Sequence, residues 1–203
     1  MKVCCLDLEL NQPSGKIIQI GYVIVDLNTK KVFRERSLIV NPNEPLGEIE
    51  REVNGKKMTI EELTGITEAR IKFDGRSLVD TYEILCIDIV QTNCSVTCVQ
   101  WGDGMGDHKG DHDAIRRELG IEWKDFVFRA RSWDVKSLYQ IYAAFNNRGV
   151  VAGLGKAMKS CGLEFEGKEH DALDDAKNTF TIFNHLAQKM NLYDKIKKLT
   201  SSH

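Results

Sequence analysis

The sequence predicts an α/β fold, a mixed five-stranded sheet with helices on both of its faces. Three strand-like segments joined by short polar turns open the chain, at residues 3–10, 17–25 and 32–40. Segments with helical periodicity then alternate with two further apolar segments. Short turns favour an antiparallel meander, and strands separated by helices favour longer crossings, so the two parts together indicate a mixed sheet.

The other elements follow in order along the chain. Residues 41–57 are polar, contain Pro42 and Pro45, and are expected to form a loop with a short helix. Thr59 begins a helix, because Thr59-Ile60-Glu61-Glu62 matches a capping box, and Gly65 ends it. Further helices are expected at 74–90, after 110, and at 134–145, 153–160 and 171–190, and the last two strands at 95–101 and 126–130.

The composition is that of one ordinary globular domain spanning residues 1–203. Hydrophobic residues make up 42% and charged residues 29% of the chain, and 28 Lys and Arg nearly balance 30 Asp and Glu. This balance excludes a broadly basic nucleic-acid wrapper but leaves room for a local basic groove. No apolar run reaches the roughly 20 residues of a membrane span, and no signal peptide is visible. The six cysteines lack zinc-site spacing, so we expect a cytoplasmic protein with reduced thiols.

An acidic step closes the first strand. Asp7 and Glu9 are two residues apart, and side chains two apart on a strand share one face. Two adjacent carboxylates repel each other and lose hydration, and a divalent cation with oxygen ligands compensates for both effects. On its own such a step is more often a solvated strand edge, so further ligands are needed to identify a metal site.

A second group stands near the end of the chain, in His170-Asp171-Ala172-Leu173-Asp174-Asp175. His170 and Asp175 are five residues apart, about 1.4 helical turns, so they do not share a helix face. With Asp171 as N-cap, His170 lies in the preceding loop and Asp175 in the early turns of the helix. Asp175 then completes the metal site begun on the first strand, and His170 overhangs it.

A fourth carboxylate is expected from the Gly- and Asp-rich segment after the strand 95–101. We favour Asp111, because apolar residues follow it four and eight positions on, along one helix face. Asp107 and Asp113 stay open, since Gly110 blurs the point at which the helix begins.

Four acids and one histidine are the components of a two-metal phosphodiesterase. Two divalent ions about 4 Å apart generate hydroxide and stabilise the attacking and leaving oxygens. In this scheme Asp7 bridges the ions and Asp111 supports one of them. Glu9 and Asp175 hold the ion that activates water. His170 accepts the proton of the attacking water, since the pKa of histidine is near neutrality.

The ordered set of motifs resembles the DEDDh 3′–5′ exonuclease superfamily, and most of all its branch with the histone-mRNA exonuclease and short-RNA trimming enzymes. The similar segments are Asp7-Leu8-Glu9, Ile17-Ile18-Gln19-Ile20-Gly21, Leu63-Thr64-Gly65-Ile66-Thr67, Trp101-Gly102 with Asp111-x3-Ile115, and Gly167 to Asn178. More Gly and Asp residues separate Trp101 from Asp111 than is usual in the family. The resemblance implies a ribonuclease H-like fold, two Mg²⁺ or Mn²⁺ ions, and release of nucleoside 5′-monophosphates from the 3′ ends of single-stranded RNA or DNA.

The resemblance also implies substrate contacts. Leu8, Leu10 and Gln12 lie beside the first motif, where the family wedges the terminal base and places its 3′-hydroxyl. Trp133 is a candidate stacking surface, and a core position for it is equally compatible with the sequence. The cations available for phosphates are Arg129, Arg131 and Lys136.

Other interpretations fit fewer of these features. His108 and His112 are four apart, as in some zinc sites, but Gly110 disfavours a helix between them. A catalytically reduced nucleic-acid-binding module of the same fold has no need for His170. Endonucleases of this fold generally lack such a histidine, so His170 favours the exonuclease.

Overall fold

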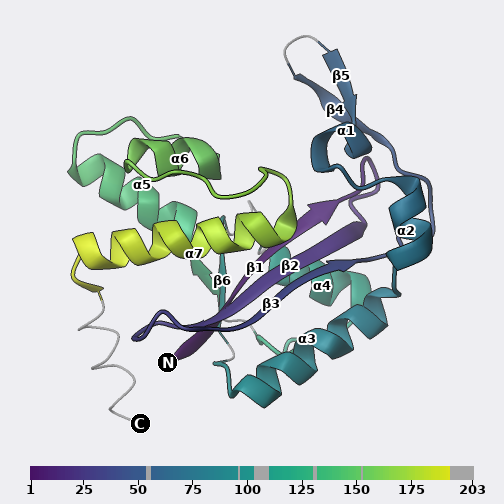
Figure 1. The fold of residues 1–203 in the computed structure, drawn as a ribbon, viewed down its shortest axis with the longest axis horizontal. Coiled ribbons are helices and arrows are strands. Elements are labelled where there is room, and N and C mark those ends of the chain that lie inside the picture. The colour runs from purple at the N-terminus through teal and green to yellow at the C-terminus, as the bar shows by residue number, and fades with distance from the viewer. Residues whose placement is uncertain (54–55, 96, 103–109, 130–131, 152, 193–203) are drawn as a thin grey trace.

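A computed structural model gives the fold of the chain (Figure 1). It describes residues 1–53, 56–95, 97–102, 110–129, 132–151 and 153–192. The central sheet has the order β3-β2-β1-β6-β7 and consists of β1 (Lys2–Leu10), β2 (Ile17–Asp26), β3 (Val32–Ile39), β6 (Cys98–Gln100) and β7 (Ser132–Asp134). The first three strands are antiparallel neighbours, and β6 and β7 join in parallel. This is the mixed five-stranded sheet that the sequence predicts.

The two faces of the sheet carry separate apolar cores. One face is covered by α5 (Val135–Phe145), α6 (Leu154–Ser160) and α7 (Ala172–Lys189), and the other by α3 (Leu78–Thr92) and α4 (Asp111–Leu119). Val3 and Cys5 of β1 pack on the side of α7, whereas Cys4 packs on the side of α3. Asp7 and Glu9 continue the row of Val3 and Cys5, so the strand periodicity directs both carboxylates to the face covered by α7.

A third apolar core lies under α1 (Ile60–Thr64) and α2 (Glu68–Asp74). Thr59 is the N-cap of α1: its hydroxyl accepts a hydrogen bond from the Glu62 N–H at 3.0 Å. The Glu62 carboxylate accepts one from the Thr59 N–H at 3.1 Å. Gly65 follows the helix in the left-handed conformation, at φ 76°. The predicted capping box and helix end are both confirmed.

The prediction of a loop with a short helix at residues 41–57 is wrong. That segment contains an antiparallel hairpin of β4 (Glu48–Val53) and β5 (Lys56–Thr59), at the top of Figure 1. The sequence holds a signal for it, since Asn54-Gly55 is typical of a two-residue hairpin turn. The many charged residues around that dipeptide obscure the strand pattern.

Three other predicted elements differ in their bounds. The fifth strand is β7 and not 126–130, whose two phenylalanines are buried in a turn on the side of α3. Their apolar alternation therefore reflects burial without strand pairing. The strand β6 is shorter than the predicted 95–101. The helix predicted at 74–90 corresponds to α3, which begins later, after the N-cap Ser77, and ends at Thr92; Asp74 is instead the last residue of α2.

Within the described part of the chain, no helix has both the length and the apolar character needed to cross a membrane. The cysteines are free thiols, and Cys4, Cys5, Cys98 and Cys161 are buried. Cys4 and Cys5 lie in the cores on opposite faces of β1.

Candidate active site

The strand β1 presents two acidic side chains near its end. Asp7 pairs across the sheet with Gly21, and Glu9 pairs with Gln19, both on β2. Glu9 is only 8% exposed, and Asp7 is half-buried. Carboxylates in this position have lost much of their hydration, and either a proton or a cation compensates for that loss.

The N-terminus of α7 lies directly on β2 beside these carboxylates. A Cβ atom on Gly21 would lie 2.0 Å from the carbonyl carbon of Ala172, so only glycine permits the approach. The buried side-chain amide of Gln19 donates to the Asp171 carboxylate at 3.1 Å and accepts from the Ala172 N–H at 3.0 Å. The two residues that pair with the acidic step therefore also fix the start of α7.

Asp171 is the N-cap of α7, as predicted from the sequence. Its carboxylate accepts hydrogen bonds from the backbone N–H groups of Leu173 at 3.1 Å and Asp174 at 3.3 Å. His170 precedes the cap in the left-handed conformation, at φ 65°. Its backbone N–H donates to Oδ2 of Asp175 at 3.2 Å. The loop and the first helical turn thereby bring His170 and Asp175 together.

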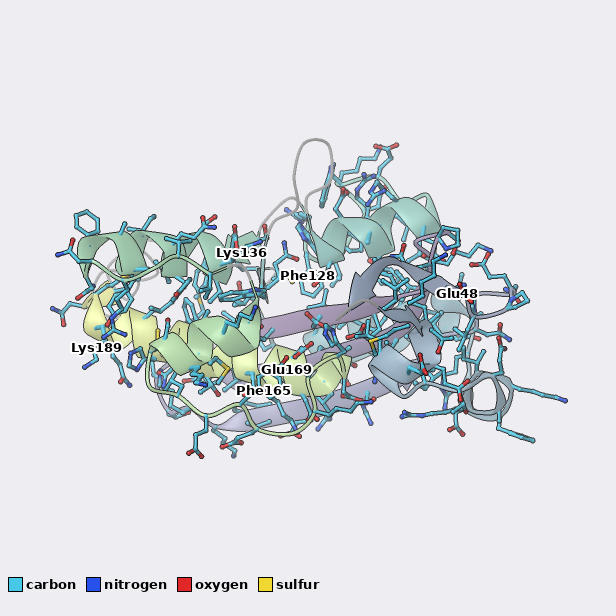
Figure 2. The ribbon with its side chains drawn as sticks, turned by 90° about the horizontal axis from the view of Figure 1, so that it is seen from above. Glu48, Phe128, Lys136, Phe165, Glu169 and Lys189 are labelled. Carbon is cyan, nitrogen blue, oxygen red and sulfur yellow. The ribbon has the colours of Figure 1, made fainter. Side chains whose placement is uncertain are left out.

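Three of the predicted side chains converge closely. Glu9, His170 and Asp175 each offer one ligand atom, and these atoms lie within 4.8 Å of one another. The His170 side chain is exposed, and Asp175 is half-buried. A cavity of about 190 Å³ adjoins them, lined by residues 153–156 and by Glu169, which is labelled in Figure 2. The site is thus open to solvent on the side of His170.

Asp111 is the first residue of α4, and a second buried glutamine fixes the start of that helix. Oε1 of Gln100, at the end of β6, accepts from the His112 N–H at 3.3 Å and lies 3.1 Å from His112 Nδ1. Gly110 precedes the helix at φ 80°, where a Cβ atom would lie 2.3 Å from Nε2 of Gln100. The start of α4 is therefore held against the strand next to β1.

Two of the three candidates for the fourth carboxylate, Asp111 and Asp113, lie in the described part of the chain. Asp111 raises the pKa of both carboxyl groups on β1 by charge repulsion, so it lies close to them. Asp113 is buried and paired with Arg116 at 2.8 Å and Arg117 at 3.1 Å, so its charge is already compensated. Asp107 lies outside the described residues. The ion pairs of Asp113 therefore favour Asp111 over Asp113 as the fourth carboxylate, and the choice between Asp111 and Asp107 stays a prediction.

All four carboxyl groups have raised pKa values, with burial as the largest cause and repulsion from neighbouring carboxylates as a further one. The pKa of Asp7 lies well above its usual range. The pKa of Glu9 is raised to about 8, although the Lys168 ammonium opposes the shift. Those of Asp111 and Asp175 are raised to about 7. Bound cations would remove this repulsion and let all four groups ionise.

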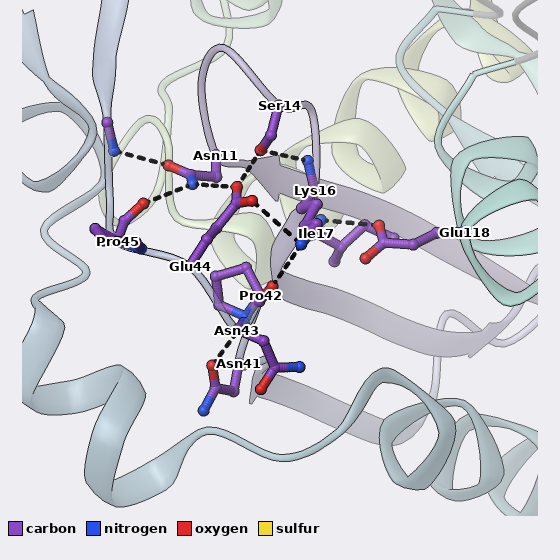
Figure 3. A network of polar contacts seen from close by, with 11 residues as sticks. Asn11, Ser14, Lys16, Ile17, Asn41, Pro42, Asn43, Glu44, Pro45 and Glu118 are labelled. Atoms are coloured by element: carbon purple, nitrogen blue, oxygen red, sulfur yellow. Dashed lines mark hydrogen bonds and ion pairs between the residues drawn. The ribbon is translucent and has the colours of Figure 1, made fainter.

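A polar network holds the loop that follows the acidic strand (Figure 3). The Asn11 side-chain amide donates to Glu44 Oε1 at 2.7 Å and to the Pro45 carbonyl at 3.0 Å. Lys16 forms an ion pair with Glu44 at 3.1 Å. Both ends of the loop are thereby tied to the segment before the hairpin, and Gln12 lies half-buried between them.

The predicted substrate contacts on β1 differ in their environments. Leu8 is 8% exposed and packs into the core on the side of α3, facing away from Asp7 and Glu9. Little of its surface is therefore accessible to a substrate. Leu10 and Gln12 are half-buried, and both have accessible surface near the end of the strand. A substrate contact by any of these three residues stays a prediction.

Trp133 packs against the core on the side of α7, with its ring centroid 5.6 Å from that of Phe183. This position agrees with the core interpretation, although part of the ring stays accessible. Of the three cations proposed for phosphates, Arg129 is exposed, Lys136 lies half-buried on α5 (Figure 2), and Arg131 lies outside the described residues.

The histidine pair weighed as a zinc site is only partly described, because His108 lies outside the described residues. His112 is buried, contacts Gln100, and lies with its ring centroid 5.5 Å from that of Trp123. Its surroundings are those of a core histidine.

Three residues that build the site were not identified from the sequence: Gln19, Gly21 and Gln100. Each was visible as an exception within a strand of otherwise apolar residues. A buried amide needs hydrogen-bond partners, and a glycine inside a strand often marks a close approach of another backbone. Neither exception, however, indicates which segment it contacts.

No family model matches the sequence, and no curated protein matches it. Solved structures match the fold. The nuclease domain of 3′hExo, a DEDDh family member bound to rAMP, superimposes with a TM-score of 0.66 at 17% identity, over 93% of this chain and 92% of that one. Cell-death related nuclease 4 (CRN-4) superimposes with a TM-score of 0.70 at 17% identity, over 93% of this chain and 64% of that one. E. coli exonuclease I in complex with a dA16 oligonucleotide superimposes with a TM-score of 0.60 at 13% identity, over 97% of this chain and 42% of that one. The chain therefore has the fold of the DEDDh exonuclease domains, the ribonuclease H-like fold that its motifs imply.

Proposed function

We propose that this chain is a single-domain, metal-dependent 3′–5′ exonuclease that shortens single-stranded RNA or DNA and releases nucleoside 5′-monophosphates. One observation carries the proposal: carboxylates from β1, α4 and α7 gather with His170 around the end of the central strand. The fold supports it, since the similar solved structures are nucleases and two of them hold rAMP or an oligonucleotide.

The donor set fits Mg²⁺ or Mn²⁺. Carboxylate oxygens are the ligands that these hard ions prefer. Two such ions would be held by Asp7, Glu9, Asp111 and Asp175, and when bound they would supply a nucleophilic hydroxide and neutralise charge on the scissile phosphate. The raised pKa values of the four groups support this assignment, because burial and mutual repulsion of carboxylates are the effects that a bound cation offsets.

His170 is the proposed general base. Its side chain is exposed beside Glu9 and Asp175, so it has access to a water molecule and to solvent for the onward transfer of a proton. Leu10, Gln12 and Trp133, which are half-buried, are proposed to contact the terminal nucleotide, with a smaller contribution from Leu8 because it is buried.

The test is digestion of 5′-labelled single-stranded oligomers of RNA and DNA. We expect stepwise shortening with Mg²⁺ or Mn²⁺ and none with EDTA. Asp7→Asn, Asp175→Asn and His170→Ala should each lower the rate by at least about 100-fold, since each removes a metal ligand or the base. Undiminished digestion by Asp7→Asn would refute the proposal.

A matched control is Asp174→Asn. Asp174 adjoins Asp175, but its carboxylate accepts the Lys168 N–H at 2.9 Å, a contact that the asparagine oxygen can keep. Its rate should stay within about two-fold of the wild type, as for most surface substitutions. The same oligomers distinguish the exonuclease from a nucleic-acid-binding module of this fold, because such a module would bind the oligomers without shortening them.

A further inference from the structure

We infer that the chain has a second metal-binding mode, in which Glu9, His170 and Asp175 together bind one borderline cation such as Zn²⁺ and thereby switch the nuclease off. The proposed activity uses His170 as a free base. The geometry, however, places its ring nitrogen in the same cluster of ligand atoms as the two carboxylates, all within 4.8 Å.

The spacing is close to that of a zinc site. Zinc bonds of about 2.0–2.2 Å in tetrahedral geometry separate the ligand atoms by about 3.4 Å. The three atoms therefore need to approach one another by at most about 1.4 Å. Because His170 is exposed, its ring is free to make that movement.

The backbone supports the same arrangement. His170 has a positive φ of 65°, and its N–H donates to Asp175 Oδ2 at 3.2 Å, so the loop holds the backbone of His170 beside the carboxylate that its ring would join. Oδ1 of Asp175 is left for a cation. One face of the cluster adjoins the cavity of about 190 Å³, which leaves room for a water molecule as fourth ligand. Three protein ligands and one open position are typical of zinc sites that exchange a ligand.

The mixed donor set selects between cations. Imidazole nitrogen binds Zn²⁺ and Co²⁺ well, whereas Mg²⁺ prefers oxygen ligands only. A Zn²⁺ ion held in this way would occupy two carboxylates that the Mg²⁺ form needs and would immobilise the general base. This inference rests on the proposed function for the loss of activity, but the binding itself is independent of any substrate.

The experiment is a competition titration of the metal-free full chain with Zn²⁺ and a chromophoric chelator, without nucleic acid. We expect one Zn²⁺ per chain, and His170→Gln should weaken its binding by at least about 100-fold, because losing a ligand should cost no less than losing a residue that orients one. The shift in melting temperature caused by Mg²⁺ should be the same in both proteins. His185→Gln is the matched control, since His185 lies ten residues after Asp175 along α7, about 15 Å from it, against Tyr142.

Co²⁺ provides a second measurement that activity does not influence. Its visible spectrum should show nitrogen and oxygen ligands in the wild type and should change in His170→Gln. Equal Zn²⁺ affinity in the two proteins, or a thiolate charge-transfer band indicating that cysteines hold the ion, would overturn the inference. If the oligomers are never shortened but His170 is required for Zn²⁺ binding, the nuclease proposal fails and the metal site stands.

Discussion

Two helix N-termini, those of α7 and α4, carry acidic side chains to β1 and are held in different ways. Each is fixed by a buried glutamine on a neighbouring strand: Gln19 for α7 and Gln100 for α4. The start of α7 has two further supports, the Asp171 side-chain cap and the close contact on Gly21. The start of α4 has Gly110 as N-cap, which has no side chain to accept a hydrogen bond.

Among the described residues, this difference indicates which carboxylate is held by fewer contacts. Asp175 is positioned by a cap, a glutamine and direct backbone packing, so the loss of one of them leaves the others. Asp111 relies far more on the contact between Gln100 and His112. Substitutions that remove these supports one at a time test this difference.

The largest effect is expected for Gly21→Ala. The added Cβ atom would lie 2.0 Å from a carbonyl carbon at the start of α7, and only a movement of backbone relieves that overlap. We expect a loss of about 3 kcal/mol in the free energy of unfolding. Chemical denaturation measures the stability, and the oligomer assay should show a rate lower by about 100-fold, as for a misplaced catalytic group.

Gly149→Ala is the control, because no atom lies within 4 Å of the Cβ atom that it would add. It should change the unfolding free energy by less than about 0.5 kcal/mol. Equal stability and activity of the two variants would mean that α7 does not rest on Gly21.

Replacing either of the two glutamines should lower the apparent affinity for Mg²⁺, but to different degrees. Gln100→Ala removes the main support of α4 and should weaken Mg²⁺ binding by about 100-fold, whereas Gln19→Ala should weaken it by about 10-fold. Mg²⁺-dependent shifts in melting temperature measure both values. The reverse order would show that the cap of α7 contributes less than its geometry indicates.

The pH dependence of stability gives an intermediate effect. Carboxyl pKa values near 7 and 8 in the metal-free fold exceed those of the unfolded chain, about 4, so the folded state binds more protons in this interval. The free energy of unfolding in EDTA should therefore fall as pH rises from about 4 to 8. At pH 8, saturating Mg²⁺ should raise the melting temperature by about 5–10 °C. A gap between the EDTA and Mg²⁺ curves that does not widen with pH would contradict the clustering of these acids.

The smallest effect is expected for Asp171→Ala. It removes the side-chain cap of α7 and should cost about 1 kcal/mol, as should Ser77→Ala at the N-cap of α3. The two variants should differ in metal binding, because only Asp171 lies beside the carboxylate cluster. Calorimetric Mg²⁺ titration of both proteins measures the affinity. An equal change in Mg²⁺ affinity would mean that Asp171 stabilises the helix without influencing the metal site.

The same contrast explains what the sequence could predict. At α7, the acidic cap and the spacing from His170 to Asp175 are local features, so both side chains were placed correctly. At α4, a glycine cap gives no side-chain signal, so three aspartates stayed open. The ion pairs of Asp113 count against that residue, and Asp107 lies outside the described residues.

The roles of Gln19, Gly21 and Gln100 depend on contacts between segments far apart in the chain, and a single sequence does not specify such contacts. The sheet itself was predictable because hydrophobic periodicity is local. The hairpin of β4 and β5 was missed because its many charged residues obscure the alternation of apolar and polar side chains. Only the dipeptide Asn54-Gly55 in the sequence was informative.

The central claim is that four carboxylates from β1, α4 and α7 form one cluster that binds two cations. A count of bound Mn²⁺ by electron paramagnetic resonance tests it most directly. With a single-stranded oligomer whose terminal linkage resists hydrolysis, we predict two Mn²⁺ per wild-type chain and at most one for Asp7→Asn. Equal Mn²⁺ binding by the two proteins would contradict the account.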